Sequence, residues 1–494
     1  MILQNNSMSN SKSVTKNYLY NLIYQILLII IPIITTPYVS RVLGADGVGK
    51  FSFSNSITSY FVIFASLGFG YYAQREIAKH QDNKKKQTEI FWEIIIVRFA
   101  SVLTVLTFYF IAIALGVFKE EYTILMIILS INILSIAFDI SFLFAGNEVF
   151  SKTVLTNTFL RILNVIAIFV FVKDRNDLWK YALITALTVL IANASLTLFS
   201  KDFLCKIEIK SLKPIRHIKP AVILFLPTIA VSVYAYLDKT MIGVITGSDF
   251  ENGFYEQAEK IVKMVMTVVT SLGTVMIPRN ANAFERKDME AIRQNIYRSI
   301  RFVLLLGIPM MIGLIAVSDN MVPWFLGEGY YKSANIMKIL SVLILAIGLN
   351  NVFGLQYLIP AGEDKKFTVS VTCGAITNFL LNLVLIRLFK SYGAALATIV
   401  AETVVAIIMF CFIRKNISFV EICKSSVKYL ISGVIMFVPC FIVGRILEPS
   451  IINTFVIVFI GVVVYLICLI LLKDGFFFET ANRLISRLPI KKHS

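Results

Sequence analysis

The sequence predicts an all-α polytopic membrane protein with about 14 transmembrane helices, two pseudo-symmetric six-helix lobes and two C-terminal helices. Composition is the first reason. Of the 494 residues, 57% are hydrophobic and 16% are charged, whereas a soluble domain is about half apolar and about a quarter charged. The second reason is that apolar runs of roughly 20 residues, enough to cross a bilayer, recur along the chain. A soluble globular enzyme is therefore excluded.

The apolar runs are separated by short polar connections, and each is expected to form a helix. The expected spans are 17–40, 51–73, 89–116, 122–145, 149–172, 178–200, 220–246, 253–278, 299–317, 334–358, 367–388, 391–413, 426–447 and 452–472. The expected organisation is a cytoplasmic tail (1–16), an N-lobe (17–200), a basic cytoplasmic linker (201–219), a C-lobe (220–414), helices 13 and 14 (415–473) and a basic cytoplasmic tail (474–494).

The net charge of +17 is explained by the way Lys and Arg are distributed between the two sides of the membrane. Lys and Arg are roughly three times more frequent on alternate connections than on the others, as the positive-inside rule requires. Both termini are therefore expected in the cytoplasm, and nucleic acid is not an expected partner. The six cysteines form no CxxC pair and the three histidines lie in polar segments, so neither disulfides nor a metal site is expected.

Short repeats relate the two halves of the chain. Gly44–Phe51 follows the first span, and the similar Gly247–Phe254 follows the seventh. Tyr181-Ala182 opens the sixth span as Tyr392-Gly393 opens the twelfth. Six spans per copy give a parallel repeat, the arrangement of transporters that work by alternating access. The repeat therefore favours a transporter, although a duplicated scaffold with another role is an alternative.

Two strings resemble nucleotide-binding motifs but lack the required context. Gly44–Phe51 nearly spells a P-loop, yet Phe51 occupies the position of the magnesium-binding Ser or Thr, and a helix-connecting turn is expected instead. Gly68–Ala73 matches G-x-G-x-x-A inside an apolar helix, where small residues form a packing surface. No catalytic motif is present in the sequence, so no catalytic residue is assigned and an enzyme is not expected.

Charges in the expected spans are the candidate binding residues. On span 149–172, Thr153, Asn157 and Arg161 share one helical face, with Arg161 about 18 Å along the helix. Intramembrane charges are costly and usually face a cavity or one another. Guanidinium binds phosphate oxygens in bidentate geometry, so an anionic ligand is expected. The candidate substrate-binding residues are Arg98, Asn157, Arg161, Lys260 and Lys263.

Structural pairing between side chains is the alternative for each of these charges. The candidate pairs are Arg98–Glu93, Arg161–Asp139, Glu256–Lys260 and Glu259–Lys263. The last two have the i,i+4 spacing of helical ion pairs. Both interpretations stay open for each residue, but so many intramembrane charges favour a hydrated cavity for the set.

Intramembrane carboxylates are candidates for binding a coupling cation or proton. These residues are Asp139, Asp238 and Glu402. Glu402 has no basic residue in its span, although a hydrogen bond to another helix would also explain it. The two halves differ in charge, because the second copy carries Asn378 where the first carries Arg161.

Particular strings point to a family. These are Ile31–Gly44, which continues to Gly49-Lys50-Phe51, and the seventh-span residues Pro227, Asp238-Lys239 and Ile242-Gly243. They resemble Wzx-type polysaccharide, O-antigen and capsule repeat-unit flippases of the multidrug/oligosaccharidyl-lipid/polysaccharide (MOP) exporter superfamily. The resemblance covers the whole chain, but sequence varies so much in this family that it assigns no individual binding residue.

The resemblance implies transport of an undecaprenyl-diphosphate-linked oligosaccharide repeat unit to the outer leaflet of the bacterial cytoplasmic membrane. It implies a cationic cavity and coupling to a sodium or proton gradient, with no cofactor. The expected partners are the lipid-linked oligosaccharide, the bilayer, a polysaccharide polymerase and chain-length machinery. The alternatives are a peptidoglycan-precursor flippase, a multidrug/cation antiporter, which would need an acidic cavity, and a membrane polymerase or glycosyltransferase, which would need a large outer loop.

Overall fold

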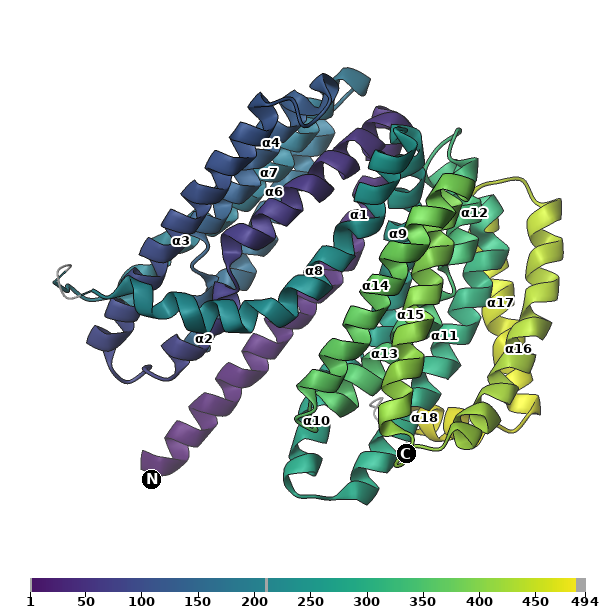
Figure 1. Cartoon of the computed structure of the whole chain (residues 1–494). Helices are drawn as coiled ribbons and strands as arrows, with labels where there is room; N and C mark the ends of the chain where they lie inside the picture. Colours follow the sequence, from purple (N-terminus) through teal and green to yellow (C-terminus); the bar gives the residue numbers. More distant parts are fainter. Residues whose placement is uncertain (1, 209–211, 486–494) are drawn as a thin grey trace, which may run out of the picture. The chain divides into compact units, whose positions relative to one another are not determined.

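The computed structural model describes residues 2–208 and 212–485, and every regular element in these ranges is helical (Figure 1). Ten described helices are long and apolar enough to cross a membrane, and a bent pair, Asp249–Thr270 and Val275–Glu285, passes the same test together. The predicted all-α multi-pass membrane fold is therefore confirmed, while the count of fourteen spans stays a prediction.

The chain forms two compact units. Unit 1 comprises Met1–Val244 with Ser248–Gly253, and unit 2 comprises Ile245–Gly247 with Phe254–Ser494. Most of the seventh expected span, 220–246, therefore belongs to unit 1 by its contacts. The predicted boundaries of the lobes, linker and tails stay predictions, and residues 486–494 of the C-terminal tail lie outside the described residues.

Unit 1 is built from helices that match the first seven expected spans. They are α1 (Ile2–Ser66), α2 (Phe69–Ala78), α3 (Lys84–Ala114), α4 (Thr123–Ser135), α5 (Ser141–Gly146), α6 (Phe150–Phe171), α7 (Leu178–Ser195) and α8 (Ile218–Thr246). Short 3-10 turns join or extend them at Glu120–Tyr122, Ile136–Phe138, Arg175–Asp177, Leu196–Asp202 and Pro214–His217.

Two breaks divide the first two expected spans. Gly44 interrupts α1 with φ 67° and ψ 174°, a conformation that glycine adopts without a side-chain clash. The string that resembles a P-loop is thus a helix joint, as expected. A second break, at Leu67 and Gly68, was not expected, because Gly68–Ala73 was assigned to a continuous helix. Gly68 is left-handed and lies against Phe225 of α8, where a Cβ would clash.

The repeated glycine strings contact each other within unit 1. A Cβ at Gly49 would overlap the carbonyl oxygen of Asp249, and a Cβ at Gly253 would overlap the carbonyl oxygen of Ala45. The two contacts are reciprocal, since each glycine faces the backbone four residues before the other glycine. Helix α9 (Asp249–Thr270) therefore begins in direct backbone contact with α1.

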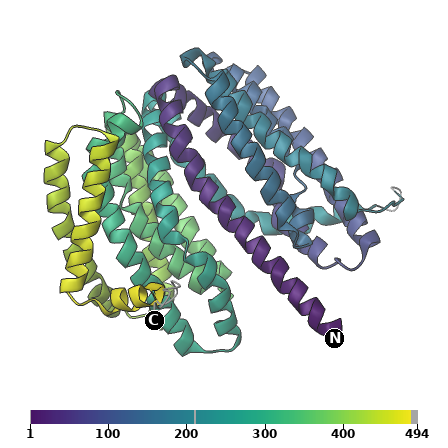
Figure 2. The same ribbon diagram turned by 180° about the vertical axis from the view of Figure 1, so that it is seen from behind.

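Unit 2 contains the remaining helices, which also follow the expected spans. They are α9, α10 (Gly273–Glu285), α11 (Met289–Phe325), α12 (Tyr331–Leu340), α13 (Leu343–Asn350), a π-helix (Asn351–Leu358), α14 (Asp364–Phe389), α15 (Ser391–Ile413), α16 (Phe419–Ile446), α17 (Ile451–Leu471) and α18 (Gly475–Ile485). In Figure 2, α16 and α17 lie side by side in yellow at the edge of this unit.

Many outward-facing side chains are large and apolar. Leu103 of α3, Phe159 of α6 and Phe459 of α17 are each more than three-fifths exposed. Exposing so much apolar surface to water would be costly, at about 25 cal/mol for each Å², whereas lipid chains solvate it without that cost. Inside unit 1, Phe69, Ile94 and Phe144 belong to a buried cluster that joins α2, α3 and α5. These three helices surround the polar groups described next.

Candidate functional site

Helix α6 presents an open polar face in unit 1. Asn157 is half-buried and Arg161 is exposed on this face, and only 11% of the most apolar part of the helix is buried in the protein. One turn further on, the Asn164 side chain donates a hydrogen bond from Nδ2 to Thr188 Oγ1 of α7, at 2.8 Å. Asn164 thus joins the two helices, while the Arg161 side chain is exposed at the surface of α6.

Arg98 braces the break between α4 and α5. Its side chain is 2% exposed. Nη1 donates a hydrogen bond to the carbonyl oxygen of Asp139 and lies 3.7 Å from Asp139 Oδ2. The guanidinium carbon also lies 5.2 Å from the centre of the Phe142 ring. Asp139 has an extended backbone, and its Oδ1 accepts a hydrogen bond from the Ser141 amide at the start of α5.

The predicted pairing of Arg98 with Glu93 is therefore wrong, and Asp139 pairs with Arg98 instead of Arg161. Sequence spacing favoured a partner on the same helix. The break at Asp139 exposes a backbone carbonyl as well as a carboxylate, so it stabilises a guanidinium more effectively.

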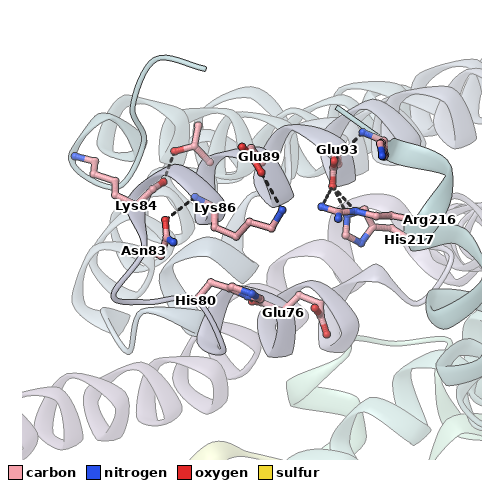
Figure 3. A network of polar contacts seen from close by, with 11 residues as sticks. Glu76, His80, Asn83, Lys84, Lys86, Glu89, Glu93, Arg216 and His217 are labelled. Carbon is pink, nitrogen blue, oxygen red and sulfur yellow. Dashed lines mark hydrogen bonds and ion pairs between the residues drawn. The ribbon is translucent and has the colours of Figure 1, made fainter. Parts of the chain in front are cut away.

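Glu93 fastens the segment before α8 onto α3 (Figure 3). Its Oε2 accepts hydrogen bonds from Arg216 Nε at 2.9 Å and Nη2 at 2.5 Å, and lies 2.6 Å from His217 Nε2. Its Oε1 accepts from the Lys213 backbone amide at 2.7 Å. The other ring nitrogen of His217 lies 2.6 Å from the Tyr72 hydroxyl of α2. Glu93, Arg216, His217 and Tyr72 thus form a network that we call the Glu93 clasp.

The sequence alone did not reveal this clasp. Positively charged residues near Arg216 were attributed to an inner loop, and His217 was placed in a polar segment, although its side chain is 3% exposed. Glu93 itself enters the sequence analysis only as a candidate partner of Arg98. The isolated signal was an acidic residue on an otherwise apolar helix, which requires a partner from elsewhere in the chain.

The charged candidates after α7 have different surroundings. Lys263 Nζ lies 2.6 Å from Glu259 Oε1, which confirms this predicted i,i+4 pair, and the lysine is half-exposed. Lys260 is half-buried on the same helix, α9. Asp238 is buried on α8 in unit 1. Glu402 of α15 accepts a hydrogen bond from Asn350 Nδ2, at 2.7 Å between Nδ2 and Oε2.

A chain of buried amides and hydroxyls joins α14 to α15 in unit 2. Asn382 Nδ2 donates to Asn378 Oδ1 at 3.0 Å, and Asn378 Nδ2 donates to Thr398 Oγ1 at 3.3 Å. The Thr398 hydroxyl also lies 3.4 Å from the Tyr255 hydroxyl of α9. Across residues 2–208 and 212–485, no three His, Cys, Asp or Glu side chains come together in a way that could hold a metal ion.

Unit 2 also contains an apolar cavity of about 570 Å³. It lies between α9, α11, α16 and α17, with Val268, Leu305, Met436 and Val462 among the lining residues. Its walls are almost entirely hydrocarbon, so it suits an apolar chain better than a hydrated group. Hydropathy could not locate this cavity, because it depends on how four distant helices pack.

Comparison with known families decides the identity. The polysaccharide biosynthesis protein family matches residues 14–284, which are more than half of the chain. The chain belongs to this family. The match spans unit 1 from residue 14 onward and continues through α9 and most of α10.

Two curated relatives of this family member are similar over most of their length, and a third over about a third of its length. A putative O-antigen transporter of Escherichia coli (strain K12) is 25% identical over 392 residues, which cover 78% of this chain and 93% of that protein. A putative O-antigen transporter of Shigella dysenteriae is 23% identical over 388 residues, covering 77% and 95%. The lipid II flippase MurJ of Bacillus subtilis is 27% identical over a shorter stretch, 36% of this chain and 34% of that protein.

Solved structures share the fold of this family member. A lipid II flippase MurJ in an inward closed conformation has a TM-score of 0.67 at 17% identity, covering 90% of this chain and 99% of that one. An inward-facing MATE family transporter of the MOP superfamily has a TM-score of 0.61 at 13% identity, covering 81% and 99%. The chain is thus a member of the polysaccharide biosynthesis protein family, and its fold is shared with a lipid II flippase and with a transporter of the MOP superfamily.

Proposed function

We propose that the protein moves an undecaprenyl-diphosphate-linked oligosaccharide repeat unit from the inner to the outer leaflet of the bacterial cytoplasmic membrane. The observation that carries this proposal is the open face of α6, where Arg161 stands exposed on a membrane-spanning helix. Membership of the polysaccharide biosynthesis family and similarity to putative O-antigen transporters support the choice of cargo. Both termini lie in the cytoplasm in this proposal.

The diphosphate is bound by the cationic and amide side chains. Arg161 offers a planar donor pair that matches two phosphate oxygens, and Asn157 on the preceding turn offers a further donor. Lys260 and Lys263, in unit 2, are further candidates for binding an anionic group of the cargo. Arg98 has a different role here, because it is buried against Asp139 and positions the helix break.

The polyprenyl chain needs an apolar path. The cavity between α9, α11, α16 and α17 offers hydrocarbon walls of the required kind. A lipid substrate therefore fits the protein better than a hydrophilic drug would. Transport proceeds by alternating access, without nucleotide hydrolysis, in a chain for which no cofactor is proposed.

A cation or proton gradient supplies the driving force in this proposal. Glu402 is the principal candidate for binding the coupling ion, with Asp238 and Asp139 as further candidates. Glu402 accepts a hydrogen bond from Asn350, so Glu402→Gln can keep that contact through its amide oxygen while removing the charge. Transport by this variant should lose its dependence on the sodium or proton gradient. Unchanged dependence on both gradients would remove Glu402 from the coupling role.

The decisive experiment measures lipid-linked intermediates in cells that make the polymer. Loss of the protein should trap the completed repeat unit in the inner leaflet, and Arg161→Ala should do the same while the protein is present at its normal level. Arg387→Ala, which removes an exposed arginine at the end of α14, is the matched control and should transport normally. Repeat units that reach the outer leaflet in cells lacking the protein would contradict the proposal.

The same cells separate the other functions. Accumulation of peptidoglycan precursor instead of the repeat unit would indicate the precursor flippase. Loss of drug efflux with no trapped lipid would indicate the antiporter. Outer-leaflet repeat units that stay unpolymerised would indicate a polymerase. A polysaccharide polymerase and chain-length machinery are the partners that the proposed activity requires downstream.

A further inference from the structure

A second cavity lies within unit 1, between α2, α5 and α6. Its volume is about 280 Å³. Gly70, Tyr71 and Gln74 line it from α2, Ser141 from the start of α5, and Thr153 from the start of α6. Helix α2 leads into the connection 79–83, and α5 and α6 flank the connection 147–149; the charge pattern places both connections on the cytoplasmic side. The cavity is thus close to the leaflet where the cargo is made.

The cavity wall is uncharged and mostly apolar, with a few neutral hydrogen-bonding side chains. Across residues 2–208 and 212–485, the side chains of Gln74, Ser141 and Thr153 make no hydrogen bond to another protein group. Together they offer hydroxyl and amide donors and acceptors to a ligand. Tyr71, 77% exposed, adds an aromatic ring, and Phe142 and Val154 add apolar wall. Apolar faces combined with a few neutral hydrogen-bonding groups match a sugar ring, which has C–H faces and hydroxyl edges.

The cavity also stands at a suitable distance from the anion-binding residue. Thr153 and Arg161 are eight residues apart on the same side of α6, which corresponds to about 12 Å along the helix. A cargo whose diphosphate contacts Arg161 would therefore place its first sugars one or two rings away, within reach of the cavity. A phosphate would not be stabilised in the cavity itself, since none of its lining residues is cationic.

We propose that this cavity is a sugar-binding subsite, in which Gln74, Ser141 and Thr153 recognise a hexose ring of the lipid-linked oligosaccharide. The inference rests on the proposed flippase function and adds the residues that select the glycan. The subsite distinguishes cargo by hydroxyl pattern, while the diphosphate and the polyprenyl chain are common to all such lipids.

Gly70 allows the cavity to be filled without disturbing the fold. A Cβ added there meets no atom within 4 Å, because the position faces the open space of the cavity. Gly70→Phe should therefore occupy the subsite while α2 keeps its conformation. Gly475, at the start of α18, also has no atom within 4 Å of an added Cβ, so Gly475→Phe is the matched control.

Binding of two lipids to the purified full-length protein in nanodiscs tests the proposal. The probes are undecaprenyl diphosphate and the same lipid carrying the complete repeat unit, extracted from cells that make the polymer. The unaltered protein should bind the glycosylated lipid at least tenfold more tightly than the bare lipid. Gly70→Phe should abolish that difference and leave the affinity for the bare lipid unchanged, whereas Gly475→Phe should preserve both affinities.

A more conservative variant keeps the proposal testable if Gly70→Phe does not fold. Thr153→Val keeps the shape of the side chain but removes its hydroxyl, and should weaken binding of the glycosylated lipid alone by about three- to tenfold. Thr153→Ser should restore it. Equal weakening of both lipids, or no change in either, would overturn the sugar subsite alone. If the unaltered protein binds neither lipid, the proposed flippase function fails and the subsite falls with it.

Discussion

The helix pair α6–α7 in unit 1 and the helix pair α14–α15 in unit 2 correspond in the sequence repeat but differ in packing. Both pairs are joined by an asparagine and a threonine, through Asn164–Thr188 at 2.8 Å and Asn378–Thr398 at 3.3 Å. In the second pair the backbones are so close that a Cβ at Gly393 would overlap the carbonyl of Leu385. The buried fraction of the most apolar window is 11% for α6 and 28% for α14.

This difference shows how two copies of the same helix pair can diverge, so that only one copy carries a candidate binding site. In the α14–α15 pair, which we call the closed pair, Asn378 is fully buried; its Nδ2 donates across to Thr398 of α15, and its Oδ1 accepts from Asn382 of α14. In the α6–α7 pair, which we call the open pair, the corresponding residue Arg161 is exposed. A polar residue in a membrane helix therefore indicates function only when packing leaves its face open.

The largest effect on stability is expected when the charge of the open pair is moved into the closed one. Asn378→Arg places a bulky guanidinium in a sealed interface between α14 and α15, at a cost of about 3–5 kcal/mol. The purified variant should aggregate or unfold far below the parent's midpoint in a thermal melt. Asn157→Arg on α6 is the control and should stay folded. Equal stability of the two variants would break the comparison.

The next effect tests the backbone contact itself. Gly393→Ala should cost about 1–3 kcal/mol through overpacking, because the added methyl meets the backbone of Leu385. The corresponding residue of the open pair is already alanine, Ala182. The reverse change, Ala182→Gly, should cost only about 0.5–1 kcal/mol, the ordinary helix penalty. Thermal midpoints of both variants in detergent decide the order, and the opposite order would refute close packing as the distinction.

A smaller effect is expected from the hydrogen bond of the open pair. Asn164→Ala removes the bond to Thr188, and interhelical bonds of this kind contribute about 0.6 kcal/mol on average. A double-mutant cycle with Thr188→Val measures the coupling free energy directly. A coupling above about 2 kcal/mol would mean that the pair depends on this bond as strongly as on packing.

The smallest change in stability is expected for Arg161→Asn, which gives the open pair the residue of the closed one. Because Arg161 is exposed, unfolding should shift by no more than about 0.5 kcal/mol. Transport of the repeat unit should nevertheless fall sharply, as measured by its accumulation in the inner leaflet. Full transport by this variant would show that the cation on α6 is dispensable.

Hydropathy predicted the helices because it depends on local composition over a span, and the joint at Gly44 was predicted from glycine alone. The second break was missed because it depends on Phe225 of α8 packing on Gly68. The candidate residues Asn157 and Arg161 were predicted from spacing on one helix, and their assignment as binding residues stays a prediction.

The electrostatic partners were harder to predict. Glu93 meets Arg216 and His217, and Arg98 meets the carbonyl of Asp139. Each partner comes either from a helix that is distant in the sequence or from a backbone group freed by a helix break. Neither kind of partner can be recognised from the sequence of the helix that carries the charge. The sequence shows that an intramembrane charge needs compensation, but three-dimensional packing decides which group provides it.

The reciprocal contact between Gly49 and Gly253 has a consequence for sequence variation. The three atoms nearest to a Cβ at either glycine are backbone atoms, of Ala45, Asp249 and Gly253, so neighbouring side chains can change without altering these contacts. A side chain added at either glycine, in contrast, cannot be accommodated by a smaller residue opposite, because the atoms that it would meet first belong to the backbone. Among related chains, glycine should persist at both positions while the surrounding residues change.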